Sequence, residues 1–380
     1  MKTNTMHKKG IAIIVIILFI GISVIPSTGI NIPITGRQTI YVDDDNTAGP
    51  WNGTLEHPYQ YIQDGIDNAS NGDTVFVFNG TYYGKEPIIE TQVKVNKTID
   101  LIGENRINTI IDGGSGEESL VVVRITADWV NISGFTIQNG GQDGFGLVAY
   151  SSHTNVSNNN IGPNHDRVAL SIHGSCNTVI GNNISFNDYD GIFTSVGDTI
   201  IIDNTISNNR WGIFISGDVN VNISGNNISH NDEGICSTGL GTGNCNISGN
   251  IFSNNNDAIE LDLHYSNNIF SGNIFSDNGC GISLSSENAD NIISGNNFTN
   301  NDIGVILAGF RSNKIFNNNF INNRRSATFY LLSLFNKWDG NYWDKPRVFP
   351  YPIIGCLGLF IPSWVNFDWH PASEPYDIGV

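Results

Sequence analysis

A short motif returns about every 23 residues along most of this chain, and that period restricts the fold more than any other feature. From Val130 onward the sequence keeps close to S-G-N-N-[IF]-S-x-N-x-x-G-I. One apolar anchor aligns in each copy: Ile137, Ile161, Ile184, Ile206, Ile228, Phe252, Phe275, Phe298, Phe320 and Trp343. Successive anchors are 24, 23, 22, 22, 24, 23, 23, 22 and 23 residues apart. Because a unit this short cannot bury its own apolar face, the copies are expected to stack as a solenoid.

A second apolar column follows the anchors and usually comes directly after Gly or Ala. It consists of Leu147, Leu170, Ile192, Ile213, Ile235, Ile259, Ile282 and Val305. The apolar runs are short and β-branched, and they are separated by Asn and Gly, which favour turns over helices. We therefore expect an all-β fold, a single-stranded parallel β-helix of about ten to twelve coils.

Asn recurs in two further columns. Two residues before the anchors lie Asn159, Asn182, Asn204, Asn226, Asn250, Asn273, Asn296, Asn318 and Asn341; three residues after them lie Asn164, Asn187, Asn209, Asn231, Asn255, Asn278, Asn301 and Asn323. Coils stacked at the strand spacing of about 4.8 Å would place like amides above one another, where they can hydrogen-bond along the axis. The columns predict a structural Asn ladder rather than a binding site.

Charge excludes some partners. Lys and Arg number 18 against 36 Asp and Glu, which gives a net charge of −18. Such a chain repels nucleic-acid phosphates and anionic lipid surfaces, so we expect no nucleic-acid partner.

The amino terminus has the features of an export signal. Lys8 and Lys9 precede an apolar run from Ile11 to Ile25, which is the length of a signal-peptide core. We interpret residues 1–30 as a signal peptide or, alternatively, an uncleaved amino-terminal anchor, with membrane contact through this segment only. Export would place the protein at the cell surface, outside the cell or in the periplasm. Eleven Asn-x-Ser/Thr sequons fit a surface glycoprotein, although the repeat generates seven of them by itself.

The regions flanking the repeats differ from them. Residues 39–129 are expected to form an amino-terminal cap and the first coils, with a short helix at 61–69 covering the apolar end. Residues 130–344 are the repeats. Residues 345–380 form a carboxy-terminal cap or tail, in an aromatic region that begins with Phe335.

Several of these segments resemble right-handed parallel β-helix proteins of the pectin-lyase-like fold, and among them the NosD-type repeat proteins common on archaeal surfaces. The resemblance rests on the segments 40–45, 62–66, 72–75 and 99–103, on the S-G-N-N-[IF] coils, and on Trp338-Asp339-Gly340-Asn341-Tyr342-Trp343-Asp344. It implies a surface or periplasmic protein tied to carbohydrate binding or, in a bacterial branch, to copper handling. The wider fold includes polysaccharide lyases and glycoside hydrolases.

A candidate site lies where neighbouring coils replace Asn, Ser and Gly by charged and aromatic residues. Four residues past the anchors come His165, Asp188, Arg210, Asp232 and Asn256; one position later come Asp166, Tyr189, Trp211, Glu233 and Asp257. Stacked coils would gather them into a corner patch. Aromatic faces beside carboxylates suit sugar rings, so Tyr189 and Trp211 are predicted ligand-binding residues. A solvated turn with no ligand remains the alternative.

The next strand extends this patch. Strict alternation over residues 257–264 places Glu260, Asp262 and His264 on one outward face, and we count them among the ligand-binding candidates. Asp257, Glu260 and Asp262 are weak candidates for a calcium site, because calcium prefers oxygen ligands. Without such an ion, no cofactor is expected.

Catalysis is the less favoured interpretation. The candidate residues are Asp188, Arg210, Asp232, Glu233 and Asp257, since paired carboxylates could cleave glycosides and Arg210 is the one base in the patch. No hydrolase motif accompanies them. Copper is disfavoured because Met occurs only at positions 1 and 6. Cys236 and Cys245 flank a Gly-rich corner and are either a disulfide or two packed thiols.

The sequence therefore predicts an exported, monomeric β-helix that binds a polysaccharide or surface glycan. A polysaccharide lyase or hydrolase is the second interpretation, and a structural spacer without a site is the third.

Overall fold

The computed structural model describes residues 36–85, 91–114, 120–141, 144–164, 168–217, 220–237, 243–261, 266–285, 289–309, 312–331, 333, 335–356 and 364–379. The predicted export segment, residues 1–30, lies outside this set. The chain divides into two units, Met1–Gly36 and Arg37–Val380. No helix among the described residues is long and apolar enough to cross a membrane.

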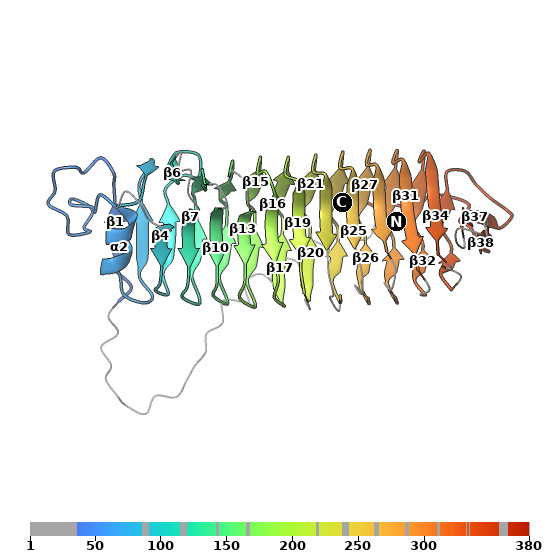
Figure 1. Cartoon of the computed structure of the whole chain (residues 1–380), viewed down its shortest axis with the longest axis horizontal. Coiled ribbons are helices and arrows are strands. Elements are labelled where there is room, and N and C mark those ends of the chain that lie inside the picture. Colours follow the sequence, from blue (N-terminus) through green and yellow to red (C-terminus); the bar gives the residue numbers. More distant parts are fainter. Residues whose placement is uncertain are drawn as a thin grey trace, which may run out of the picture. The chain divides into compact units, whose positions relative to one another are not determined.

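Arg37–Val380 is a parallel β-helix, as the repeat predicts (Figure 1). Each full coil gives one strand to each of three sheets, which we name A, B and C. Sheet A contains β1 (Thr39–Val42), β2 (Thr74–Val77), β5 (Asp100–Gly103), β8 (Asn131–Ser133), β11 (Asn155–Ser157), β14 (Thr178–Ile180), β17 (Thr199–Ile202), β20 (Val221–Ser224), β23 (Asn246–Ser248), β26 (Ile269–Ser271), β29 (Ile292–Ser294), β32 (Lys314–Phe316), β35 (Lys337–Asp339), β38 (Trp364–Asp368) and β37 (Tyr351–Gly355).

Sheets B and C complete the coils. Sheet B contains β3 (Gly80–Tyr82), β6 (Thr109–Asp112), β9 (Thr136–Gln138), β12 (Asn160–Ile161), β15 (Asn183–Ser185), β18 (Thr205–Ser207), β21 (Asn227–Ser229), β24 (Ile251–Ser253), β27 (Ile274–Ser276), β30 (Asn297–Thr299), β33 (Asn319–Ile321) and β36 (Tyr342–Trp343). Sheet C contains β4 (Thr91–Val95), β7 (Val121–Ile125), β10 (Phe145–Ala149), β13 (Val168–Ile172), β16 (Asp190–Thr194), β19 (Trp211–Ile215), β22 (Glu233–Ser237), β25 (Asp257–Leu261), β28 (Cys280–Leu284), β31 (Ile303–Ala308) and β34 (Arg325–Tyr330).

The two apolar columns of the sequence form the core. The anchors lie in sheet B, where Ile184 pairs with Ile206, and the second column lies in sheet C, where Ile192 pairs with Ile213. All members of both columns are buried. A small residue precedes the second column because the next coil is close: a Cβ on Gly212 would lie 2.5 Å from the carbonyl oxygen of Gly234.

The Asn columns form hydrogen-bonded ladders. In the first column, the backbone N–H and side-chain Nδ2 of Asn204 both donate to Oδ1 of Asn226, at 2.9 and 3.0 Å. Nδ2 of Asn204 also donates to the carbonyl oxygen of Val179 at 2.9 Å. The same pattern links Asn182, Asn204, Asn226, Asn250, Asn273, Asn296 and Asn318. The second Asn column forms the same hydrogen bonds from one coil to the next, from Asn164 to Asn323. Buried polar groups of each corner are thereby satisfied within the solenoid.

A third, shorter ladder was not predicted. It joins Asn268, Asn291, Asn313 and Asn336, which lie 23, 22 and 23 residues apart. Its regular interval was visible in the sequence, but its members precede sheet A and were not aligned with the anchors.

Aromatic anchors stack through the later coils. The rings of Phe252, Phe275, Phe298, Phe320 and Trp343 follow one another with centroids 4.5 to 4.9 Å apart and planes within 6°. Their separation matches the strand spacing, so a column of identical residues becomes a column of offset-stacked rings.

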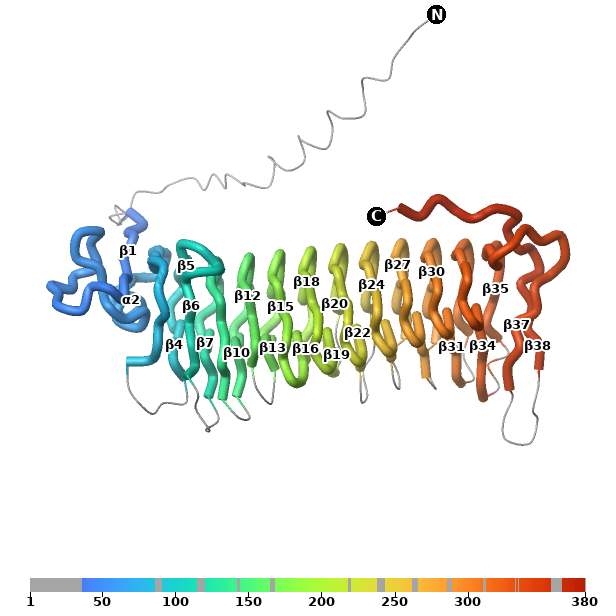
Figure 2. Tube along the Cα trace, turned by 90° about the horizontal axis from the view of Figure 1, so that it is seen from above, coloured from blue at the N-terminus to red at the C-terminus, as the bar shows by residue number. Residues whose placement is uncertain are grey.

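The two ends of the solenoid differ from its middle (Figure 2). At the first coils, α2 (Ile62–Asn68) buries Ile62, Gly65 and Ile66 in the core. At the last coils, β37 and β38 form an antiparallel hairpin at the end of sheet A. Trp338 and Trp343 are buried there, whereas Trp364 and Trp369 are exposed. Among the described residues, Cys236 and Cys245 are not joined by a disulfide, so the disulfide alternative for this pair is wrong.

Candidate functional site

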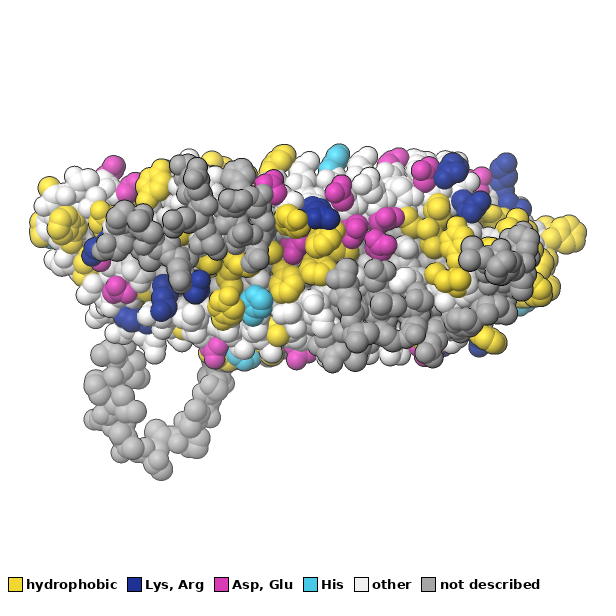
Figure 3. All heavy atoms as spheres, in the orientation of Figure 1, with side chains coloured by type: hydrophobic (Ala, Val, Ile, Leu, Met, Phe, Trp, Pro, Cys, Tyr) yellow, Lys and Arg dark blue, Asp and Glu magenta, His cyan; other side chains and the backbone are white. Residues whose placement is uncertain are grey.

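Aromatic side chains form a continuous strip on the outer side of sheet C. The strip consists of Tyr150, His173, Phe193, Phe214, Trp211 and Tyr189, and each ring contacts the next with centroids 4.9 to 6.3 Å apart. The four coils that carry β10, β13, β16 and β19 supply one or two rings each. Figure 3 shows hydrophobic side chains, a His and a basic side chain gathered over these strands, with acidic side chains beside them.

Arg210 contacts both predicted ligand-binding aromatic residues, Tyr189 and Trp211. Its Cζ lies 4.9 Å from the ring centroid of Tyr189 and 4.8 Å from that of Trp211. Tyr189 is 41% exposed and Trp211 is partly buried. A guanidinium held by two rings keeps a fixed position on the surface.

The alignment of the two aromatic residues requires a correction. The sequence placed Tyr189 and Trp211 in one column, but in sheet C Trp211 pairs with Asp190. The interval between paired residues of these two coils is 21 positions in sheet C, from Ile192 to Ile213. In sheet B it is 22 positions, from Ile184 to Ile206. Tyr189 instead lies at the corner, where its carbonyl oxygen accepts hydrogen bonds from the backbone N–H groups of Arg210 and Trp211.

Asp190 is a candidate that the sequence analysis missed. Its side chain is only 5% exposed, and burial raises its pKa to about 7 against the opposing effect of Arg210. One carboxylate oxygen, Oδ1, is buried without a hydrogen-bond partner. A signal was present, because Asp190 directly precedes Gly191 of the second column, at the position that Trp211, Glu233 and Asp257 hold in the following coils.

An acidic row adjoins the strip. Glu233 pairs with Asp257 across β22 and β25, and Glu260 pairs with Cys236. Burial, with a smaller effect of Glu233, raises the pKa of Asp257. Cys236 is buried between these acids, and desolvation raises the pKa of its thiol strongly. The row can accept hydrogen bonds from ligand hydroxyls on three neighbouring positions.

The remaining predicted residues lie at the corner or outside the described residues. Asp188 and Asp232 are exposed, and Oδ1 of Asp232 accepts a hydrogen bond from Asn256 at 3.3 Å. β25 ends at Leu261, so Asp262 and His264, like His165 and Asp166, lie outside the set that the structure describes. Within that set no group of three or more His, Cys, Asp or Glu side chains is arranged to hold a metal ion. Asp257 and Glu260 therefore do not complete a calcium site with the described residues alone.

The comparisons with known proteins identify the fold. A family model described as a right-handed β-helix region matches residues 168–323. No curated protein is significantly similar to the sequence. Pectate lyase Pel9A superposes with a TM-score of 0.56 at 18% identity, over 82% of this chain and 81% of its own. The A-module of the mannuronan C-5 epimerase AlgE6 from Azotobacter vinelandii does so with 0.56 at 15% identity, over 80% and 100%.

A third solved structure, the HK620 bacteriophage tailspike in complex with a pentasaccharide, gives a TM-score of 0.54 at 14% identity, over 80% of this chain and 66% of its own. At these identities the similarity concerns the fold alone. The chain is a right-handed parallel β-helix repeat protein whose structural neighbours include carbohydrate-active and carbohydrate-binding proteins.

Proposed function

We propose that the protein binds a polysaccharide along the outer side of sheet C, with the aromatic strip as the stacking surface. The continuous run of rings from Tyr150 to Trp211 is the observation that carries this proposal. Rings that recur once per coil, at about the 4.8 Å strand spacing, offer a series of apolar faces to the C–H faces of successive sugars. Contiguous apolar patches on a protein surface often mark binding sites.

The polar groups around the strip suit the same ligand. Arg210 offers N–H donors at one edge, and Glu233, Asp257 and Glu260 offer acceptors on the next coils. Sugars carry both donors and acceptors, so a row of this kind orients a chain that stacking alone would leave free to slide. Phosphate-bearing polymers do not fit, because the acids beside the strip repel them.

The setting of this function is also a proposal. The apolar segment at residues 11–25 supports export, and the NosD-like motifs support action at the cell surface or in the periplasm, where we expect a monomer. A panel of neutral and uronic-acid polysaccharides, each tested for binding with and without calcium, would identify the ligand and show whether an ion takes part.

The decisive experiment measures retention of the protein on immobilised polysaccharides from this panel. Trp211→Ala is expected to reduce retention at least tenfold, since stacking on one sugar face contributes about 1.4 kcal/mol or more. Trp369→Ala is the matched control, because it removes an exposed Trp outside sheet C. Equal retention of both variants would show that the strip is not the binding surface. No retention of the unmodified protein on any polysaccharide would favour the spacer interpretation.

Polysaccharide cleavage is the second candidate, and Asp190 supports it. A carboxyl group with a pKa of about 7 can act as a general acid near neutral pH, with Glu233 or Asp257 as the second carboxylate. Chain shortening during the binding assay, abolished by Asp190→Asn and by Asp257→Asn, would establish an enzyme. Binding without shortening would leave a binding protein.

A further inference from the structure

Three arginines surround a pocket at the carboxy-terminal end of sheet C, away from the aromatic strip. The pocket has a volume of about 330 Å³, and its lining includes Arg324, Arg325, Arg347, Ser326, Tyr351 and Asp344. Three positive side chains and one negative one therefore share a small space in a chain whose net charge is −18. Basic side chains are visible over these last coils at the upper right of Figure 3.

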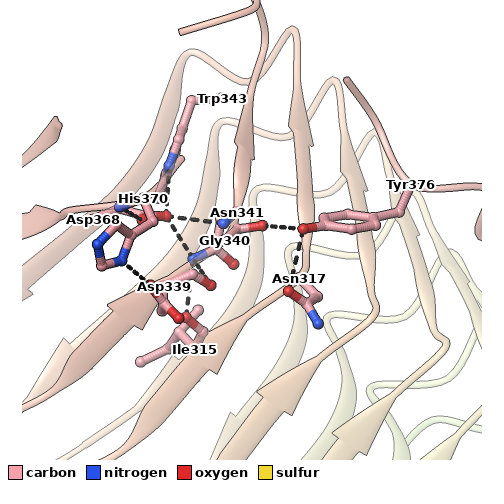
Figure 4. Close-up of polar contacts among 9 residues, drawn as sticks. All are labelled: Ile315, Asn317, Asp339, Gly340, Asn341, Trp343, Asp368, His370 and Tyr376. Atoms are coloured by element: carbon pink, nitrogen blue, oxygen red, sulfur yellow. Dashed lines mark hydrogen bonds and ion pairs between the residues drawn. The ribbon is translucent and has the colours of Figure 1, made fainter. Parts of the chain in front are cut away.

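The wall of the pocket is held rigidly. Tyr351 stacks on Trp343 with a centroid distance of 4.1 Å and an interplanar angle of 14°. Trp343 ends the aromatic stack of the core, and its indole N–H donates to Oδ2 of Asp368 at 3.0 Å (Figure 4). Through Trp343, Tyr351 is thus packed against the end of the core before a ligand arrives.

Two of the three guanidinium groups have a contact within the described structure. Cζ of Arg347 lies 4.6 Å from the ring centroid of Tyr351, and its Nε donates to the carbonyl oxygen of Trp343 at 3.4 Å. Arg324 is held by Oδ1 of Asp302 at 3.3 Å. Within the described part of the chain Arg325 has no ion-pair partner. Guanidinium groups that still have N–H groups to donate match the two or three oxygens of an oxyanion.

We propose that this pocket binds an oxyanion, either as a free inorganic ion or as the charged group of an acidic glycan. The guanidinium groups of Arg325 and Arg347 donate to the ligand oxygens, and Arg324 adds positive charge. Tyr351 positions the guanidinium of Arg347 over its ring at the wall of the pocket. The pocket does not share residues with the aromatic strip, so the two sites can bind independently.

The test is titration calorimetry of the purified protein at low ionic strength with sodium sulfate, sodium phosphate, glucuronate and a glucuronate-terminated oligosaccharide, and with glucose as the neutral control. We expect binding of at least one anion and none of glucose. Arg325→Gln and Arg347→Gln should each weaken that binding about tenfold, as expected when a charged donor is removed. Preference for the oligosaccharide over both inorganic ions identifies a glycan, and the reverse identifies a free ion.

Lys314→Gln is the matched control, because it removes one exposed positive charge from sheet A outside the pocket. Arg347→Lys retains the charge but loses the planar fork, so it should also weaken binding. Arg325, Arg324 and Arg347 are exposed, so unchanged melting temperatures are expected for all variants. The proposal is overturned if no anion binds, or if Lys314→Gln weakens binding as much as Arg325→Gln. Trp211→Ala should not affect anion binding, which separates this site from the polysaccharide surface.

Discussion

Asn341 donates two hydrogen bonds to a single oxygen of Asp368, from its backbone N–H at 2.9 Å and from its Nδ2 at 3.0 Å (Figure 4). Asp368 thereby takes the place that the next Asn would occupy in the ladder. Every earlier Asn accepts from one coil and donates to the following one, but the last position has no following coil. A carboxylate only accepts hydrogen bonds, so it ends the ladder without leaving a buried N–H unsatisfied.

Replacing Asp368 should therefore destabilise the last coils. Asp368→Ala leaves the indole N–H of Trp343 and both donors of Asn341 buried without their acceptor. We expect a loss of about 3 kcal/mol in the free energy of unfolding, measured by urea denaturation. Asp368→Asn should cost less, since an amide oxygen remains. The prediction would be wrong if Asp368→Ala unfolded at the same urea concentration as the unmodified protein.

A substitution in the middle of the ladder should have a similar effect. Asn226→Ala removes the acceptor of Asn204 and the donor to Asn250 in a fully enclosed corner. The expected cost is about 2 to 4 kcal/mol, again from urea denaturation. Asn227→Ala is the adjacent control, because Asn227 is exposed on sheet B; its effect should stay within about 0.5 kcal/mol. Equal effects of the two substitutions would contradict the structural role of the ladder.

The aromatic stack gives a third prediction. Phe275→Ala opens a cavity between Phe252 and Phe298 and removes two stacked contacts. A cost of about 3 to 5 kcal/mol is expected. Phe275→Ile restores the residue type that serves as anchor in earlier coils and should recover much of this loss. Thermal unfolding of the two variants compares them directly, and a Phe275→Ile protein no more stable than Phe275→Ala would refute this account.

The raised pKa of Asp190 predicts that the free energy of unfolding depends on pH. Its pKa is about 7 in the folded protein and about 3.9 in an unfolded chain. Between these values the folded state keeps the proton that the unfolded state releases, so stability falls as pH rises from about 4 to about 7. The free energy of unfolding is therefore highest below about pH 4 and lowest above about pH 7. The ionisation of this one carboxyl group lowers it by at most about 4 kcal/mol between these limits.

The measurement is urea denaturation of Asp190→Asn and the unmodified protein at pH 4.5, 6 and 8. The variant should be the more stable of the two at pH 8, with a smaller difference at pH 4.5. Asp188→Asn is the charge-matched control, because it also removes one carboxylate from the neighbouring corner. Parallel profiles for Asp190→Asn and the unmodified protein would show that burial does not shift the pKa of this group.

Much of the architecture follows from the sequence because every coil repeats the same sequence pattern and forms the same local structure. An apolar anchor such as Ile184, a Gly or Ala before residues such as Ile213, and an Asn such as Asn226 recur at one interval. Their periodicity identifies the coil, its buried side and its corner amides without any long-range information. The gathering of Tyr189, Arg210 and Trp211 could be anticipated because neighbouring coils lie side by side, although Trp211 pairs with Asp190 and not with Tyr189.

Tertiary structure decided the features that depend on departures from the period. The corner between sheets B and C is one residue shorter in the coil of Trp211 than in the coil before it. Trp211 therefore lies opposite Asp190 and not opposite Tyr189. The return of β38 brought Asp368 onto the end of the ladder, and β37 brought Tyr351 against Trp343 beside three arginines. The repeat determined the solenoid, because its contacts connect equivalent positions one coil apart. Only the folded chain determined the Asp190 environment and the arginine pocket, because corner lengths and the path of the nonrepeating tail set which side chains meet.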